Sequence, residues 1–477
     1  MQANENLKQK SISWGEKIAL GFGMLANQMF PAALGVFIIV LVQDLGFAAI
    51  LWGIIQFAPR VFDALTDPIM GFISDNTKSK WGRRRQYILI GGIIMGLSYV
   101  AMWQLHKESG VTYNFIYFLS WSLVFYLGYT IFSVPYVALG YEISDNFHER
   151  TQVMAIAQFI GQWAWVIAPW FWVILYDPKW FPDGAGQGVR DLSIWVAIPC
   201  SLFAIIPALF IKQKSTLDRK DFLPITAGYI KKSLGGIFTS AFEAFKIKQF
   251  RRISAATFLI YNSFNIIASF TFLIIVHYLF NGSPADAGNW PAMHGSVGAL
   301  ITSFLVIPTI AYMSKKLGKK RAFIISQLIS IIGYILFWFL FVPGKPYLFL
   351  YALPFHSFGI GSLFTIMMSM TADICDLDEL ETGKRREGVL GAVYWWMVKL
   401  GFAIAALMGG LILTVVGFDA NNVTESAITG MRLFYTILPI AGVLGAIWVM
   451  KDYNITEERS QEIKEQLTLK RKAQNNN

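Results

Sequence analysis

The sequence is poor in charged residues, in cysteine and in histidine. Only 15% of its 477 residues are charged, and it has 2 cysteines and 5 histidines. No group of histidines and cysteines has the spacing of a metal site. No glycine-rich phosphate loop follows a strand pattern. The sequence therefore gives no support to a histidine- or cysteine-based metal site, or to an ATP-driven pump.

Apolar residues fill most of the chain instead. Hydrophobic residues make up 55% and aromatic residues 16% of the sequence. Apolar windows of about 20 residues, which is enough to cross a bilayer, recur along the whole length. We therefore predict an all-α membrane protein with twelve transmembrane helices. The predicted spans are Lys17–Val42, Ile50–Ile73, Tyr87–Trp103, Tyr113–Leu139, Val153–Leu175, Leu192–Ile211, Ile253–Leu279, Pro291–Met313, Ala322–Val342, Tyr347–Ala372, Val389–Val416 and Met431–Met450.

Basic residues are distributed unevenly over the predicted loops. The basic residues of the outer loops are Lys107, Lys179, Arg190, Lys345 and Arg432. Apart from Arg60 and Lys399, which fall within spans, the rest of the 40 Lys and Arg lie on the inner side. This positive-inside pattern predicts that both termini are cytoplasmic. It also explains the net charge of +10 without a nucleic-acid partner.

The N-terminal residues and the two cysteines give two further expectations. The first sixteen residues are polar and the first apolar run is long enough to span, so we expect no cleaved signal peptide. The topology places Cys200 and Cys375 near opposite faces, so we expect no disulfide between them.

A polar stretch divides the spans into two groups of six. We predict an N-terminal half at residues 1–211, a cytoplasmic linker at 212–252, a C-terminal half at 253–450 and a cytoplasmic tail at 451–477. The middle of the linker is weakly amphipathic, which favours a position along the inner membrane surface. Basic loops containing glycine follow the second and the eighth span. Two matching halves suggest the major facilitator fold, with a solute bound between them near the midplane.

Two carboxylates lie in the middle of the second span. Asp63 and Asp67 are four residues apart and so share one helix face. A single charge at this depth costs roughly 2.5–3.5 kcal/mol on insertion scales. We expect Lys399 or Arg60 to neutralise the pair when no cation is bound.

Hydroxyl groups near this pair complete a predicted cation site, to which Thr66 and Thr130 add ligands. Oxygen ligands suit a hard cation such as Na⁺, and a proton fits equally well. The alternative is an inert ion cluster, although buried ion pairs seldom stabilise a fold enough to offset their desolvation.

The segment that carries the aspartates resembles a known family. Residues 63–71, together with Trp-Gly-Arg at 81–83, are similar to the second-helix signature of the glycoside–pentoside–hexuronide:cation symporters, the melibiose permease family. Further matches follow in order over nearly the whole chain. They lie at 134–136 (Val-Pro-Tyr), 149–151 (Glu-Arg-Thr), 372–376 (Ala-Asp-Ile-Cys-Asp), 382–388 (Thr-Gly-Lys-Arg-Arg-Glu-Gly) and 399–401 (Lys-Leu-Gly).

The resemblance implies roles for individual residues. It implies that Asp63, Asp67, Thr130 and Lys399 form or adjoin a cation site, and that the fold is that of the major facilitators. The charged and aromatic positions that bind sugar in melibiose permease are replaced here by Asn27, Gln28, Ser133, Val137 and Gln158. These departures argue against melibiose itself as the solute.

Neutral polar side chains remain at the predicted substrate positions. Amides and hydroxyls both donate and accept hydrogen bonds, which suits the hydroxyls of a sugar. The candidate substrate-binding residues are Asn27, Gln28, Tyr129, Ser133, Gln158, Gln162, Phe364 and Trp395. The candidate gating residues at the inner side are Asp75, Arg83, Arg84, Arg150, Asp373 and Arg386. Other aromatic residues are predicted to form an outer-interface belt, namely Trp163, Trp165, Trp170, Trp172 and Trp180.

Together these features predict a secondary transporter rather than an enzyme. It would import a sugar or glycoside with Na⁺ or H⁺ by alternating access, as a monomer in the inner membrane, without a cofactor. A sulfonated or deoxy sugar or a nucleoside fits nearly as well. One alternative is a lysolipid carrier of the same fold, which the neutral Gln28, Ser133 and Val137 leave open. A second is a non-transporting membrane sensor, against which the retained Asp63, Asp67 and Lys399 argue.

Overall fold

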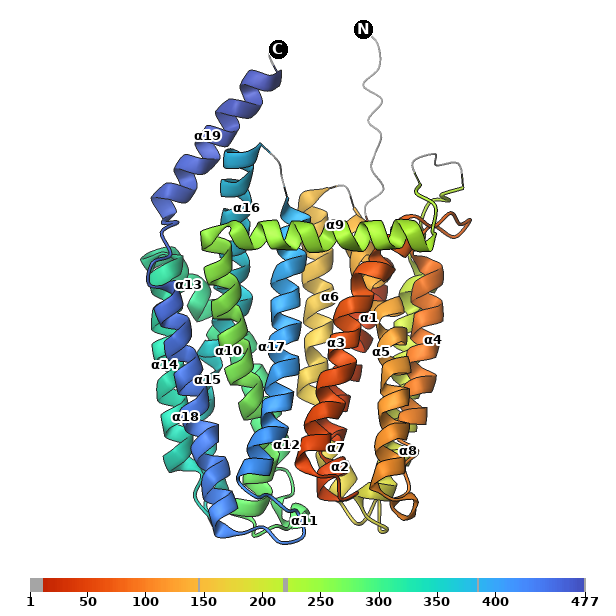
Figure 1. Ribbon diagram of the computed structural model, residues 1–477, viewed down its shortest axis with the longest axis vertical. Coiled ribbons are helices and arrows are strands. Elements are labelled where there is room, and N and C mark those ends of the chain that lie inside the picture. The colour runs from red at the N-terminus through yellow and green to blue at the C-terminus, as the bar shows by residue number, and fades with distance from the viewer. Residues whose placement is uncertain (1–11, 145, 218–221, 384–385, 476–477) are drawn as a thin grey trace.

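The protein is a bundle of long helices that run mostly along one direction (Figure 1). The computed structural model describes residues 12–144, 146–217, 222–383 and 386–475, and this part of the chain contains no β-strand. The helices before the linker are α1 (Trp14–Phe37), α2 (Val40–Gln43), α3 (Ala49–Asp75), α4 (Arg85–Met102), η1 (Lys107–Ser109), α5 (Val111–Glu142), α6 (Phe147–Ile167), α7 (Trp170–Tyr176) and α8 (Ala185–Phe210). We call α1–α8 the first half.

The linker and the remaining chain are helical too. The linker forms α9 (Ala227–Lys246). The second half consists of α10 (Lys248–Ile274), η2 (Ile275–Leu279), α11 (Pro284–Ala287), α12 (Trp290–Ile301), η3 (Thr302–Val306), α13 (Ile307–Leu317), α14 (Lys319–Leu340), η4 (Pro346–Ala352), α15 (Leu353–Ser362), η5 (Leu363–Met367), α16 (Met368–Thr382), α17 (Glu387–Val415) and α18 (Glu425–Met450). The tail forms α19 (Glu457–Asn475).

The helices are long and apolar enough to cross a membrane. Within the described residues, 11 helical segments meet this criterion by length and composition. The helix α3 does not meet this criterion, because Arg60, Asp63 and Asp67 make it less apolar. Its 27 residues nevertheless extend over about 40 Å, which is long enough to cross a membrane. Each of the twelve predicted spans overlaps one of these segments. The prediction of an all-α membrane protein is confirmed.

One end of the bundle carries α9, the beginning of α1 and α19 (Figure 1). We call this end the terminal face and the other end the opposite face. The helix α9 lies across the terminal face and contacts α3, α10 and α17. The tail helix α19 packs against α16.

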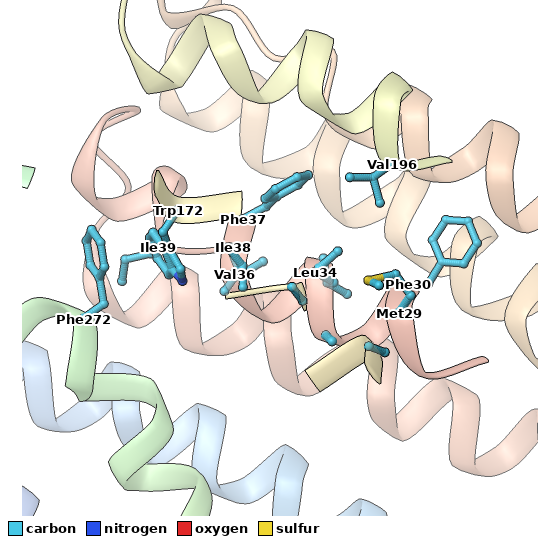
Figure 2. Close-up of a cluster of buried hydrophobic side chains, with 14 of the residues drawn as sticks. Met29, Phe30, Leu34, Val36, Phe37, Ile38, Ile39, Trp172, Val196 and Phe272 are labelled. Carbon is cyan, nitrogen blue, oxygen red and sulfur yellow. The ribbon is translucent and has the colours of Figure 1, made fainter. Parts of the chain in front are cut away.

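At the opposite face the two halves touch. Trp172 on α7 stacks on Phe272 of α10, with ring centroids 3.8 Å apart (Figure 2). A second contact joins the halves: a ring nitrogen of His277 in η2 lies 3.0 Å from the side-chain oxygen of Gln43 in α2. The hydroxyl of Ser296 donates to the carbonyl of Val166 on α6. The bundle is therefore closed between its halves at this face.

The position of Trp172 corrects a prediction. We placed this residue in a lipid-facing aromatic belt, but its side chain is only 8% exposed. The chain breaks between α6 and α7 at Pro169, and the short α7 then packs against α1 and α12. The ring of Phe272 from the second half covers Trp172, and a contact between distant segments cannot be predicted from the pattern of a single span.

Two glycines allow α3 and α17 to lie in close contact. A β-carbon added at Gly410 would lie 2.5 Å from the carbonyl oxygen of Ala49, and one at Gly53 would lie 3.2 Å from the α-carbon of Gly410. Small residues at a helix crossing let two backbones approach in this way. Because α3 belongs to the first half and α17 to the second, this contact fixes how the halves meet at the site described below.

Candidate cation and substrate site

A lysine from the second half holds both aspartates of the first. The Nζ of Lys399 on α17 donates to Oδ2 of Asp63 at 2.7 Å and also donates to Oδ2 of Asp67. The side chain of Asp63 is 6% exposed and that of Asp67 is 26% exposed. The spacing of one helical turn on α3 places the two carboxylates on one face, where the single ammonium group reaches both.

Threonine hydroxyls occupy the other side of the carboxylates. The hydroxyl of Thr130 on α5 lies 2.7 Å from Oδ1 of Asp63 and 3.3 Å from Oδ1 of Asp67. The hydroxyl of Thr66 lies 3.1 Å from that of Thr130. The structure thus brings together all five residues of the predicted cation site, from three helices and both halves. The oxygen atoms are of the kind that a hard cation binds.

Arg60 does not share in this arrangement. Its guanidinium lies 3.3 Å from the ring centroid of Phe402 on α17, and the aspartates are held by Lys399. Of the two neutralising groups that the sequence left open, the lysine is the one that forms the ion pairs. The triad of Asp63, Asp67 and Lys399 therefore has a formal charge of −1.

The prolines of α3 and α1 free backbone carbonyls for ring donors from neighbouring helices. Pro68 has no N–H to bond the carbonyl four residues earlier, which is that of Ala64, and the indole N–H of Trp396 donates to this oxygen at 3.1 Å. In α1, Pro31 frees the carbonyl of Asn27 in the same way, and the hydroxyl of Tyr129 donates to it at 3.1 Å. These two bonds fix α17 against α3 and α5 against α1 beside the carboxylates.

Several of the predicted substrate residues are half-buried beside these helices. The side-chain oxygen of Gln28 accepts a hydrogen bond from the indole of Trp165 on α6 at 2.9 Å. Oδ1 of Asn27 is buried without a hydrogen-bond partner. Ser133 is buried on α5. Tyr129 therefore adjoins Asn27, and Gln28 is held by an aromatic donor from α6.

The remaining predicted substrate residues are more exposed. Phe364 in η5 is 41% exposed and Trp395 on α17 is 43% exposed. On α6, Gln158 is exposed and Gln162 is half-buried. Within the described residues no hydrogen bond joins these four side chains to the carboxylates, and their role stays a prediction.

The first group of predicted gating residues forms ion pairs within the first half. Arg84 donates to Glu142 at the end of α5, at 2.5 and 2.9 Å, and to Asp75 at the end of α3, at 2.8 Å. Arg83 also donates to Glu142. Burial would lower the pKa of Arg84, but the bonds to Glu142 and Asp75 outweigh it, so this pKa is raised. Neighbouring Arg85 instead donates to backbone carbonyls of α8.

The second group forms a comparable set in the second half and the linker. Arg386 donates to both carboxylate oxygens of Asp378 on α16, at 2.5 and 2.8 Å, and to Glu243 of α9 at 2.7 Å. The bond to Asp378 raises the pKa of Arg386. Asp373 accepts from Lys319 at 2.5 Å and from Ser460 of α19 at 3.0 Å.

The sequence did not predict all the partners in these ion pairs. Asp378 and Glu243 were not predicted as gating residues, although the run of acidic residues that precedes the basic residues after α16 was a usable signal for Asp378. Arg150 lies near the start of α6, at the terminal face. Cys200 and Cys375 are both buried, and no disulfide joins them.

Comparison with known proteins places the chain in a family. The sequence model of the family described as MFS/sugar transport protein matches residues 19–457. An uncharacterized symporter, YnaJ, of Bacillus subtilis (strain 168) is 27% identical, over 96% of this chain and 94% of its own. The glucuronide carrier protein homolog of Escherichia coli (strain K12) is 25% identical, over 98% of each chain.

Solved structures agree on the fold. The chain is similar to the inward-facing, unoccupied structure of a bacterial homolog to the human lysosomal transporter Spinster, with a TM-score of 0.63 and 16% sequence identity. The likeness covers 94% of this chain and 97% of that one. The chain therefore belongs to the MFS/sugar transport protein family.

Proposed function

We propose that the protein imports a sugar or glycoside together with one monovalent cation, Na⁺ or H⁺, by alternating access. The observation that carries this proposal is the ion-paired triad near mid-membrane, in which carboxylates of the first half are held by a lysine of the second. Burying three charges costs free energy. We therefore infer that the triad is retained for its function. The description of the family and the names of several relatives support a sugar as the solute.

The triad acts as an exchangeable cross-link between the halves. Without a cation, the ammonium of Lys399 neutralises most of the charge of Asp63 and Asp67 and draws α17 onto α3. A cation that binds the carboxylate oxygens, with Thr130 and Thr66 at hand, competes with the ammonium for the same ligands. Cation binding thus loosens one arrangement of α3 and α17 and favours another, so it can change the affinity of an adjoining solute site.

Coupling follows by reciprocity. If the cation raises the affinity for the solute, the solute raises the affinity for the cation by the same factor. In the proposed cycle, carriers that are empty or fully loaded reorient, whereas singly loaded carriers reorient poorly.

The contacts at the two faces fit one stage of this cycle. The Trp172–Phe272 stack and the His277–Gln43 contact close the opposite face. The positive-inside pattern of the basic residues supports assigning the terminal face to the cytoplasm and the opposite face to the outside. In this orientation both termini are cytoplasmic. We further propose that the protein lies in the inner membrane and acts as a monomer. Arg84 and Arg386 then lie at the cytoplasmic side, where their ion pairs hold the helix ends of the terminal face together.

The test uses purified protein in proteoliposomes with an imposed Na⁺ or H⁺ gradient. Saccharides that raise the melting temperature in a panel of neutral and acidic sugars are offered for uptake with each gradient. We expect at least one sugar to be accumulated only when one of the gradients is present. Stabilisation by lysolipid with none by any sugar would contradict the proposal and favour the lipid carrier.

A further inference from the structure

The linker is attached to both helices that carry the triad. The helix α9 contacts α3, which carries Asp63 and Asp67, and α17, which carries Lys399. It lies across both helices at the terminal face (Figure 1). Ahead of α9, the backbone N–H of Leu223 donates to the side-chain oxygen of Asn76, just after the end of α3, at 2.9 Å. The linker therefore joins two helices that belong to different halves.

Two side-chain contacts attach α9 to α17. Glu243 accepts a hydrogen bond from Arg386, the residue before α17, at 2.7 Å. Further along α17, the ring of Phe238 packs edge to face against the indole of Trp396, with ring centroids 5.9 Å apart. This geometry stabilises an aromatic pair beyond the apolar area that it buries. The linker thus holds α17 at its start and again at Trp396.

Trp396 extends these contacts to the triad. Its indole N–H donates to the carbonyl of Ala64 at 3.1 Å, the oxygen that Pro68 leaves without a helical donor. Ala64 directly follows Asp63 in α3, and Trp396 precedes Lys399 by about one helical turn. The bond therefore joins the turn of α3 that bears the carboxylates to the turn of α17 that bears the ammonium.

These contacts favour one of the two arrangements in the proposed cycle. They are formed while Lys399 is bonded to both carboxylates, so they stabilise the arrangement in which the ammonium occupies the carboxylate oxygens. A cation has to displace this ammonium. An interaction that stabilises one state lowers the apparent affinity of a ligand that favours the other state. Contacts between the linker and α17 therefore oppose cation binding.

We propose that Phe238 and Trp396 are positioning residues through which the linker sets the cation affinity of the triad. The proposal rests on the proposed function and deepens it, because it names residues that regulate the cation site without touching the cation. Phe238 acts through Trp396, and Trp396 acts through the carbonyl of Ala64. Loosening either contact should make the cation bind more tightly. A variant that only disturbs the fold has no reason to gain affinity.

The test measures how tightly the purified full-length protein binds Na⁺ and protons without a solute. The melting temperature is recorded against Na⁺ concentration at constant ionic strength, with choline as the replacement cation, and against pH without Na⁺. A ligand that binds the folded state raises the melting temperature according to its dissociation constant. The part of each profile that Asp63→Asn abolishes belongs to the triad. We expect the wild-type protein to show such a response to one of the two cations.

Three variants test the two positioning residues. Phe238→Ala should bind the cation about 3-fold more tightly, which is the effect expected from the loss of one aromatic pair. Trp396→Phe lacks the indole donor and should bind it about 5-fold more tightly or more. Phe238→Tyr keeps the ring and should have the affinity of the wild-type protein. For a proton, tighter binding appears as a midpoint at higher pH.

Phe242→Ala is the matched control on the same helix. Phe242 lies one helical turn after Phe238, but its ring is 68% exposed, compared with 47% for Phe238. The ammonium of Lys246, also on α9, lies 5.3 Å from the centroid of this ring. The substitution removes the same atoms as Phe238→Ala and should leave the cation affinity unchanged.

The outcomes separate the two proposals. If the wild-type protein responds to a cation through Asp63, and Phe238→Ala binds it no more tightly than Phe242→Ala, the role of the linker is wrong and the proposed function stands. A lower cation affinity in Phe238→Ala also overturns the proposal, because the linker would then favour the cation-bound arrangement. If neither cation gives a response that Asp63→Asn abolishes, both proposals fail.

Discussion

The charged groups of this protein form two kinds of cluster that differ in what they join. Near the membrane midplane, Asp63 and Asp67 of the first half are paired with Lys399 of the second. At the terminal face, Arg84 pairs with Asp75 and Glu142, all of the first half. Its counterpart Arg386 pairs with Asp378 in the second half and with Glu243 in the linker.

This difference assigns different tasks to the two kinds of cluster. A pair within one half can persist while the halves move, so it stabilises the helix ends it joins. The midplane triad joins the halves and must rearrange when they move relative to each other. In the proposed mechanism a cation competes for the same carboxylates, so the triad would couple ion binding to conformational change.

The largest effect on transport is expected when a carboxylate of the triad is removed. In Asp63→Asn, Lys399 keeps only Asp67, and the proposed cation site loses the more buried of its two carboxylates. Removing one partner of a buried pair costs about 3–5 kcal/mol, so we expect ion-driven accumulation to fall by about 100-fold or more. Uptake by proteoliposomes measures this, with Arg84→Gln as the comparison from the terminal face. Equal losses in the two variants would contradict the division of tasks.

A smaller effect is expected from the helix contact that positions the triad. In Gly410→Ala, the new methyl group meets the backbone of Ala49 and Gly53, so α17 must move away from α3. Overpacking of this kind costs about 1–3 kcal/mol, and transport should fall severalfold. The control is Gly391→Ala on the same helix, where an added β-carbon has nothing within 4 Å. If the control is impaired as much as Gly410→Ala, the contact is not what positions Lys399.

The terminal-face pairs should affect stability more than coupling. Arg84→Gln leaves Glu142 with Arg83 as its remaining partner, so we expect a loss of about 1–3 kcal/mol and a melting temperature lower by a few degrees. The ratio of cation to solute transported should not change. A changed ratio, measured with paired isotopes, would place Arg84 in the coupling machinery.

The smallest effect is expected at the opposite face, where Asp44 accepts a hydrogen bond from Tyr176 at 2.7 Å. Burial raises the pKa of Asp44 to about 6, and the bond from Tyr176 opposes this only in part. A carboxyl whose pKa is higher in the folded than in the unfolded state stabilises the fold when it is protonated. For Asp44 this stability is fully present below the unfolded pKa of about 3.9 and is lost as the pH rises through the folded pKa of about 6. The melting temperature should therefore decline between about pH 4 and pH 6.

Asp44→Asn provides the matched variant for this pH dependence. The amide stays neutral, so the decline that belongs to Asp44 should vanish in this variant while the Tyr176 contact can persist. An identical pH profile in the two proteins would show that Asp44 is not the titrating group.

Much of the architecture was predictable because a bilayer imposes simple rules. Apolar windows predicted each span, and the i, i+4 spacing predicted that Asp63 and Asp67 would face the same way. The sequence predicted Arg83, Arg84 and Arg386 as gating residues, but it did not predict that Asp378 and Glu243 pair with Arg386. Those partners lie on other elements, and pairing across elements depends on how helices pack.

What the sequence determined by itself was the set of helices and the presence of buried charge near the midplane, since insertion cost and helical period act within one segment. The tertiary structure decided which cation neutralises the aspartates. Arg60 is three residues from Asp63, yet Lys399, 336 residues away, forms the ion pair. The physical reason is the close approach of α17 to α3 at Gly53 and Gly410, which brings Lys399 to the carboxylates and presses Phe402 onto Arg60. Only that packing turns four intramembrane charges into a paired triad and one guanidinium that stacks on an aromatic ring.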